Sequence, residues 1–76
     1  MAREDLDKVF FSVQTALRRS LGRLLSSPQD IDDVVQETYL RAIANNTSKS
    51  IRDPASYLFR TSRNIALNQK ARLYHQ

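Results

Sequence analysis

The sequence predicts an all-α fold, a compact domain of three helices. Its 76 residues include one Gly and two Pro, too few for a turn-rich β fold. Apolar residues recur at steps of three and four along three segments, which is the period of an amphipathic helix. Two polar breaks separate the segments, so we expect three helices around one modest core.

The first helix is expected over residues 4 to 25. Arg18, Arg19 and Arg23 lie off its apolar stripe, near the helix end, where the helix dipole favours cations. The stripe itself is formed by Leu6, Val9, Phe10, Val13, Leu17, Leu21 and Leu24.

The second helix is expected over residues 28 to 44. Ser27 is a good N-cap, and Pro28 suits the first helical position. Asp30 and the acidic residues after it crowd the first turn, where the dipole favours negative charge. The predicted buried stripe is formed by Ile31, Val34, Val35, Thr38 and Ala42.

A polar loop over residues 45 to 53 should precede a third helix over residues 54 to 72. The loop is long for a helix–helix connection, and long loops in small domains often carry function. Asp53 followed by Pro54 repeats the start signal of a cap and then a proline. The predicted inner stripe is formed by Ala55, Leu58, Ser62, Ile65, Ala66, Gln69 and Leu73.

Composition excludes several classes of protein. The chain has no Cys, which excludes disulfide scaffolds and Cys-ligated zinc, and no apolar run is long enough to span a membrane. The N-terminus is charged and unlike a secretory signal, so a cytoplasmic protein is expected. His75, next to the C-terminus, is the single His, and the hydroxyl side chains lack a nearby base. The acidic residues form no calcium loop. We therefore expect no enzyme, no catalytic residue, no metal and no cofactor.

The net charge of +4 is unevenly distributed. Residues 1–25 carry +2, residues 26–46 carry −3 and residues 47–76 carry +5. An acidic segment beside a basic one suggests two faces with different partners. The alternative is that these charges only solvate two helix surfaces.

The outer side of the second helix mixes acidic, amide and apolar residues. Apolar anchors rimmed by polar groups are typical of a partner-binding helix. The alternative is that Leu40 and Ile43 pack against the first helix. This outer set is Asp33, Gln36, Glu37, Leu40 and Ile43.

The outer side of the third helix has a different chemistry. Its cations can neutralise phosphates, its amide can hydrogen-bond a base edge, and nearby rings can stack on an unpaired base. This combination is typical of nucleic-acid binding, although a solvated basic helix is the alternative. The outer side chains are Arg60, Arg63, Asn64, Leu67, Lys70 and Tyr74, and the rings of Tyr57 and Phe59 are further stacking candidates.

Two stretches resemble bacterial sigma factors of the extracytoplasmic-function (ECF) group. Residues 30 to 42 read DIDDVVQETYLRA and are similar to region 2.2, with its acidic pair, two aliphatics, Gln-Glu, aromatic, Leu and Arg. Residues 53 to 68 read DPASYLFRTSRNIALN and resemble regions 2.3 and 2.4. Residues 8 to 25 fit region 2.1 more loosely. Tyr57 replaces a common Trp, as in the iron-transport branch, whereas Thr61, Ser62 and Asn68 depart from the family pattern.

The resemblance implies a sigma-70 region 2 domain that acts in transcription initiation in the bacterial cytoplasm. Such a domain binds the clamp helices of the RNA polymerase β′ subunit. It also recognises and helps melt the promoter −10 element by holding the non-template strand, and an anti-sigma factor can be a further partner. The family's region 4 has no counterpart in these 76 residues, which suggests an isolated region 2.

The resemblance assigns residues to both partners and agrees largely with the helix faces. Tyr39 is the exception, because the helical wheel places it at the edge of the core stripe. The loop is expected to help hold a flipped-out base, with backbone phosphate held by cations. The polymerase-binding residues are Asp33, Gln36, Glu37, Tyr39, Leu40 and Ile43. The DNA-binding residues are Asn45, Asn46, Thr47, Ser48, Lys49, Arg52, Tyr57, Arg60, Arg63, Asn64 and Lys70.

Two other hypotheses stay open. A generic basic three-helix module would bind duplex DNA as a helix-turn-helix does, and would prefer it to a single strand. A protein-interaction module would show little change in nucleic-acid binding when Arg60 and Arg63 become Ala.

Overall fold

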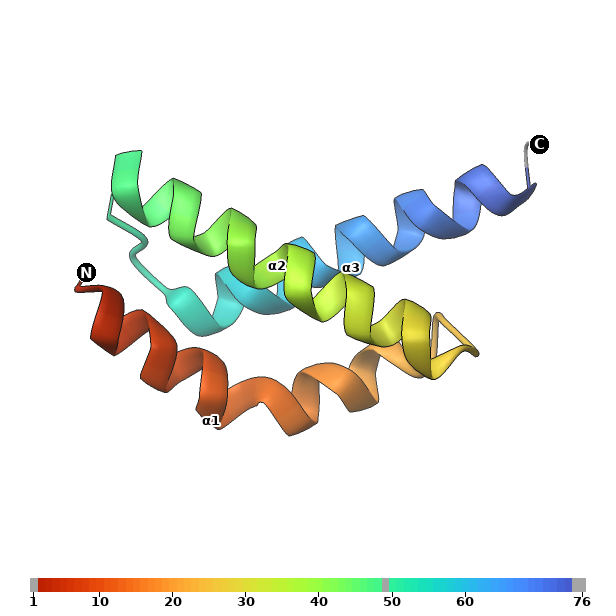
Figure 1. Cartoon of the computed structure of the whole chain (residues 1–76), viewed down its shortest axis with the longest axis horizontal. Helices are drawn as coiled ribbons and strands as arrows, with labels where there is room; N and C mark the ends of the chain where they lie inside the picture. Colours follow the sequence, from red (N-terminus) through yellow and green to blue (C-terminus); the bar gives the residue numbers. More distant parts are fainter. Residues whose placement is uncertain (1, 49, 75–76) are drawn as a thin grey trace.

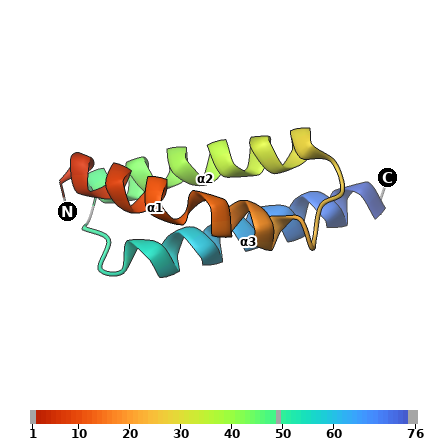
Figure 2. The ribbon, with the colours of Figure 1, turned by 90° about the horizontal axis from the view of Figure 1, so that it is seen from below.

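The computed structural model describes residues 2–48 and 50–74, without the side chains of residues 48, 73 and 74. These residues form three helices: α1 (Arg3–Leu21), α2 (Pro28–Ser48) and α3 (Pro54–Tyr74) (Figure 1). The views in Figures 1 and 2 agree that α1 and α3 run in the same direction and that α2 runs in the opposite direction. The predicted all-α fold is therefore confirmed.

The core consists of two apolar clusters, one toward each end of the bundle. Phe10 packs against both clusters and so joins them. One cluster contains Leu6, Ala42 and Leu58. The other contains Leu17, Leu21, Leu25, Val34, Val35, Ile65 and Ala66. All three predicted stripes thus contribute to the core.

Two hydroxyl groups are buried in this core. Thr38 Oγ1 donates a hydrogen bond to the Val34 oxygen at 2.7 Å, and Ser62 Oγ donates to the Phe59 oxygen at 3.0 Å. Burying a hydroxyl without a partner costs stability, so these bonds to the preceding helical turn make both residues acceptable core positions. The Ser at position 62, which departs from the family pattern, is accommodated in this way.

The predicted caps of α2 and α3 are confirmed. The Asp30 N–H donates to Ser27 Oγ at 3.4 Å, and the Ser56 N–H donates to Asp53 Oδ1 at 3.2 Å. Each bond satisfies a backbone donor in the first helical turn, which has no partner within the helix. The two prolines follow these caps directly, as expected.

The end of α1 comes earlier than predicted, at Leu21 rather than residue 25. Beyond it the backbone tightens, because Arg23 N–H bonds to the Ser20 oxygen at 3.3 Å and Leu24 N–H to the Leu21 oxygen at 2.9 Å. These bonds span three residues rather than four, which is the common form of a closing helical turn. The turn still places Leu25 in the core.

The end of α2 comes later than predicted, at Ser48 rather than residue 44. The expected loop at residues 45 to 48 is therefore wrong. Asn45 Nδ2 donates to the Arg41 oxygen at 3.1 Å, and Thr47 Oγ1 donates to the Ile43 oxygen at 2.9 Å. Short polar side chains that bond back to the preceding turn are compatible with a continuing helix. The helix α3 also runs two residues beyond the predicted end, to Tyr74.

Candidate functional site

One candidate surface lies on the outer side of the N-terminal half of α2. The residues Asp33, Gln36, Glu37 and Leu40 are all exposed there, and we call them the acidic face. Leu40 leaves 56% of its surface accessible, so it is not packed against α1 as the alternative required. These four residues line a hollow of about 290 Å³ together with Val34 and Gln69.

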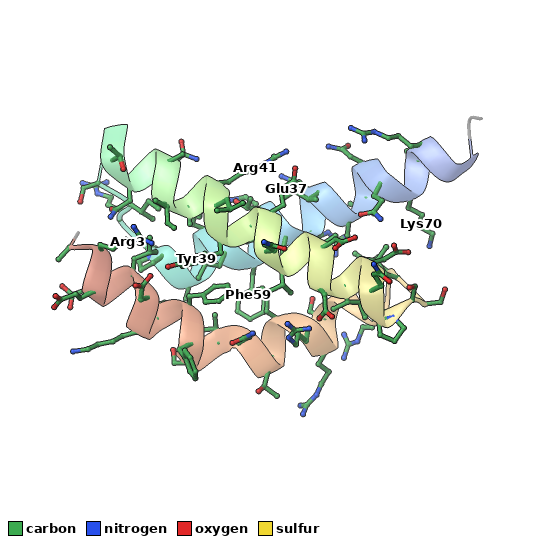
Figure 3. All side chains as sticks on the ribbon, in the orientation of Figure 1. Arg3, Glu37, Tyr39, Arg41, Phe59 and Lys70 are labelled. Carbon is green, nitrogen blue, oxygen red and sulfur yellow. The ribbon has the colours of Figure 1, made fainter. Side chains whose placement is uncertain are left out.

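The acidic face remains available to an outside partner. Glu37 forms an ion pair with Arg41 at 3.4 Å, and both side chains are about half exposed. Exposed pairs of this kind contribute little stability and exchange partners readily. Figure 3 shows the two side chains together on the outside of α2.

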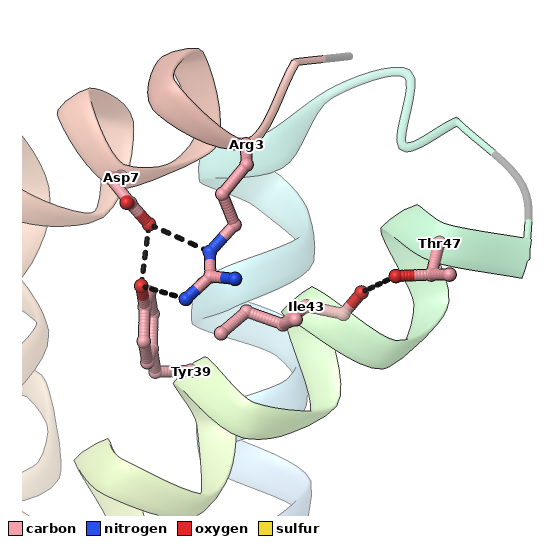
Figure 4. A network of polar contacts seen from close by, with 5 residues as sticks. All are labelled: Arg3, Asp7, Tyr39, Ile43 and Thr47. Atoms are coloured by element: carbon pink, nitrogen blue, oxygen red, sulfur yellow. Dashed lines mark hydrogen bonds and ion pairs between the residues drawn. The ribbon is translucent and has the colours of Figure 1, made fainter.

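Tyr39, predicted to bind polymerase, instead faces α1. Its hydroxyl donates to Asp7 Oδ1 at 2.6 Å and accepts from Arg3 Nη2 at 3.3 Å, as Figure 4 shows. The bond with Tyr39 raises the pKa of the Arg3 guanidinium above its ordinary value. The ring packs at a tilt against Phe10, with 4.8 Å between the ring centroids. Tyr39 therefore joins α2 to the start of α1.

Ile43 also does not join the acidic face. It is half-buried and packs against the cluster of Leu6, Ala42 and Leu58. Its backbone oxygen accepts the bond from Thr47 (Figure 4). The structure thus brings together four of the six predicted polymerase-binding residues and uses the other two in internal packing.

A second candidate surface is a hollow of about 280 Å³ where α2, the loop and α3 meet, which we call the Tyr57 hollow. Asn45 Nδ2 donates to the Tyr57 hydroxyl, which in turn donates to the Arg41 oxygen at 3.4 Å. These bonds hold the phenol ring across the junction of α2 and α3. The lining residues are Asn45, Ser50, Ile51, Arg52, Asp53, Tyr57 and Arg60.

The cap residue Asp53 contributes a stable negative charge to this hollow. Hydrogen bonds from the Ser56 backbone and hydroxyl lower the pKa of the Asp53 carboxyl below its ordinary value of 3.8, and the nearby Arg60 acts in the same direction. The two arginines of the hollow nevertheless outnumber this carboxylate. The hollow thus combines net positive charge, one aromatic ring and one amide side chain.

The remaining predicted DNA-binding residues are spread around this hollow. Arg63 and Asn64 are exposed on α3, and Arg63 lines a further hollow of about 530 Å³ with Arg60, Phe59 and Ser20. Within residues 2–48 and 50–74, neither Arg60 nor Arg63 forms an ion pair.

Other members of the predicted set do not line the Tyr57 hollow. Asn46 is half-buried and Thr47 is exposed on the last turn of α2. Lys70 lies toward the far end of α3 and is separate from the others (Figure 3). Lys49, the Ser48 side chain and, beyond the set, His75 lie outside the described residues.

Several exposed or lining residues were missed by the sequence analysis. Gln69 was expected in the core stripe, but it lines the hollow of the acidic face. Phe11 is 78% exposed on α1, and its position beside the stripe residue Phe10 is the pattern that marks it as an outward residue. The contact of Ser20 with the α3 hollow has no sequence pattern that would reveal it.

The candidate surfaces are hollows that are lined by residues on the outside of the helices. Among the described residues, no three His, Cys, Asp or Glu side chains lie close enough to hold a metal ion. None of the described helices is both long and apolar enough to cross a membrane.

Comparisons with known proteins identify the family of the chain. Residues 10–74 match the family model Sigma-70 region 2. The chain is 36% identical over 52 residues, which is 68% of its length, to the ferric citrate uptake sigma factor FecI of Escherichia coli (strain K12). It spans about 30% of the length of that relative, and no solved structure matches it. With a family model covering most of its residues, this chain belongs to the sigma-70 region 2 family.

Proposed function

We propose that the chain is a sigma-factor domain that acts in transcription initiation through two separate surfaces. The acidic face binds the clamp helices of the RNA polymerase β′ subunit. The Tyr57 hollow and the neighbouring cations of α3 bind the non-template strand of the promoter −10 element. The observation that carries the proposal is that these two surfaces are opposite in charge and share no residue.

The polymerase assignment is supported by the chemistry of the acidic face. Asp33 and Glu37 are exposed carboxylates, and Leu40 offers an apolar anchor between polar groups. Protein interfaces are commonly built from such an anchor with a polar rim. Complementary charge on the partner would set its orientation and speed its association.

A titration with a β′ clamp-helix fragment tests this assignment. We expect the wild-type chain to bind, and Asp33→Ala and Glu37→Ala each to weaken binding about threefold to tenfold, because each removes one interfacial charge. Glu4→Ala, which removes an exposed carboxylate from α1, is the matched control and should bind normally. The assignment fails if the wild-type chain shows no affinity, or if both acidic-face variants bind like the control.

The DNA assignment is supported by the Tyr57 hollow. Holding an extruded base requires a pocket with stacking and hydrogen-bonding groups, because unstacking costs a few kcal/mol. The ring of Tyr57, the amide of Asn45 and the cations Arg52 and Arg60 are such groups, and all line this hollow. Such a domain stabilises DNA strands that have already separated, and it uses no source of chemical energy.

The strand preference of the chain tests this second assignment. We expect a −10 non-template oligonucleotide to bind more tightly than the same sequence as duplex. Its affinity should fall with salt, and Arg60→Ala and Arg63→Ala should each reduce the salt slope by about 0.7. A preference for duplex would favour the helix-turn-helix alternative. Unchanged strand affinity in both variants would favour the protein-interaction module.

A further inference from the structure

The hollow at the acidic face has a neighbour, which is lined by residues of α2 and α3. The second hollow has a volume of about 240 Å³ and shares Glu37 and Gln69 with the first. Its other lining residues are Arg41 on α2 and Ile65, Asn68 and Arg72 on α3. The two hollows therefore adjoin at Glu37 and Gln69, and we call the pair the α2–α3 groove.

The charge of this groove changes sign from one hollow to the next. The first hollow is lined by the carboxylates of Asp33 and Glu37 and by no cation. The second contains the guanidinium groups of Arg41 and Arg72 against the single carboxylate of Glu37. A partner complementary to the whole groove must therefore carry a cation at one end and a carboxylate at the other.

The groove also has an apolar part. Leu40 is 56% exposed at the first hollow, and the buried side chain of Ile65 lines the second. Asp33 and Arg41 are separated by about 12 Å along α2, at a rise of about 1.5 Å per residue. That distance is about two turns of helix, and an amphipathic helix in a groove places apolar and charged side chains at such intervals.

The geometry points to α3 as the second wall of the polymerase-binding surface. We propose that the groove accepts one amphipathic helix of the polymerase core. A cation of that helix faces Asp33 and Glu37, an apolar side chain rests on Leu40, and a carboxylate faces Arg72. The side chains of Asn68 and Gln69 hydrogen-bond the same helix. This inference rests on the proposed function, and it adds three residues of α3 that the family resemblance did not assign.

Two variants of α3 test the inference in the same β′ clamp-helix titration. Arg72→Glu reverses one charge in the groove and should weaken binding about fivefold or more, because it places a carboxylate against a carboxylate. Gln69→Ala changes no charge, favours helix formation and should weaken binding about threefold through lost contact. Arg19→Glu is the matched control, because Arg19 and Arg72 are both exposed arginines in the last turn of a helix.

The outcomes separate this inference from the proposed function. If the wild-type chain binds, and both α3 variants bind more weakly while Arg19→Glu binds normally, the groove is confirmed. If Asp33→Ala and Glu37→Ala are weakened while both α3 variants bind normally, the proposed function stands and the inference is wrong. If Arg72→Glu and Arg19→Glu weaken binding equally, the loss comes from the changed net charge of the chain and not from the groove. That result would contradict the inference. A wild-type dimer that Arg72→Glu dissociates would assign the groove to a second copy of the chain and also contradict it.

Discussion

The acidic face and the Tyr57 hollow are built in different ways. The acidic face consists of four residues on one helix, so the helical period alone brings them together. The Tyr57 hollow takes its residues from the end of α2, the loop and the start of α3. Side-chain hydrogen bonds among Asn45, Tyr57 and the Arg41 backbone hold it in place.

This difference matches what each surface is proposed to bind. A rigid helical face suits another rigid helix, whose side chains present their own regular spacing. A hollow between elements suits a single base taken out of its stack, which needs contacts from several directions. The opposite charges of the two surfaces further reduce binding of the wrong partner.

The largest expected effect comes from removing the ring of the Tyr57 hollow. Tyr57→Ala should weaken binding of the −10 non-template oligonucleotide about tenfold or more, because stacking of one base on a ring is worth about 1–3 kcal/mol. Binding of the β′ clamp-helix fragment should stay within about twofold of wild type, since Tyr57 does not belong to the acidic face. Fluorescence anisotropy with each partner measures both affinities, and a parallel loss of the two would show that the surfaces are not separate.

A comparable effect is expected when the charge of the acidic face is reversed. Glu37→Lys should weaken clamp-fragment binding about tenfold, because it removes an attraction and adds a repulsion, and it also places two cations side by side with Arg41. Oligonucleotide affinity should be unchanged or slightly higher, since the added positive charge is long-ranged at low salt. A selective loss of oligonucleotide binding would reverse the assignment of the two faces.

A smaller effect is expected at Tyr39, which tests the boundary of the acidic face. Tyr39→Phe removes the bond to Asp7 and should lower the free energy of unfolding by about 1 kcal/mol. Urea denaturation followed by circular dichroism measures this change. The clamp fragment should bind as well as it does to wild type at temperatures where both chains are folded. If the stability of Tyr39→Phe is unchanged and its clamp binding is weaker, Tyr39 belongs to the polymerase-binding surface after all.

The smallest effect concerns the cap of α3. The folded-state pKa of Asp53 lies below the ordinary value of 3.8, so its ionised form stabilises the fold. This contribution is complete above the unfolded-state pKa and is lost as the pH falls through the folded-state pKa. Asp53→Asn keeps a capping side chain but cannot titrate. Thermal unfolding below about pH 4 should therefore show a shallower loss of stability for Asp53→Asn than for wild type. Identical pH profiles would contradict the proposed role of the carboxylate.

Features set by local sequence were predictable. The cap residues Ser27 and Asp53, each followed by a proline, correctly predicted where α2 and α3 begin. The helical period likewise identified Asp33, Gln36 and Glu37 as exposed. In both cases the information lies within a few consecutive turns of one helix.

Features that depend on packing between helices were not predictable. Tyr39 lies beside the core stripe on a helical wheel, and only the position of Asp7 and Phe10 on α1 decides its direction. Gln69 lines the α2–α3 groove because of how α3 crosses α2, which no pattern within α3 records. The polar composition of residues 45 to 48 suggested a loop, but the same side chains bond back to α2 and continue it.

A ternary binding experiment tests the separation of the two surfaces most directly. The β′ clamp-helix fragment is titrated into the chain with and without a saturating concentration of the −10 non-template oligonucleotide. If the two surfaces are separate, we expect a ternary complex in which the clamp-fragment affinity is unchanged within about twofold. The reason is that the two ligands contact different residues of the chain. Competition between the two ligands, or no clamp binding in either condition, would contradict the account.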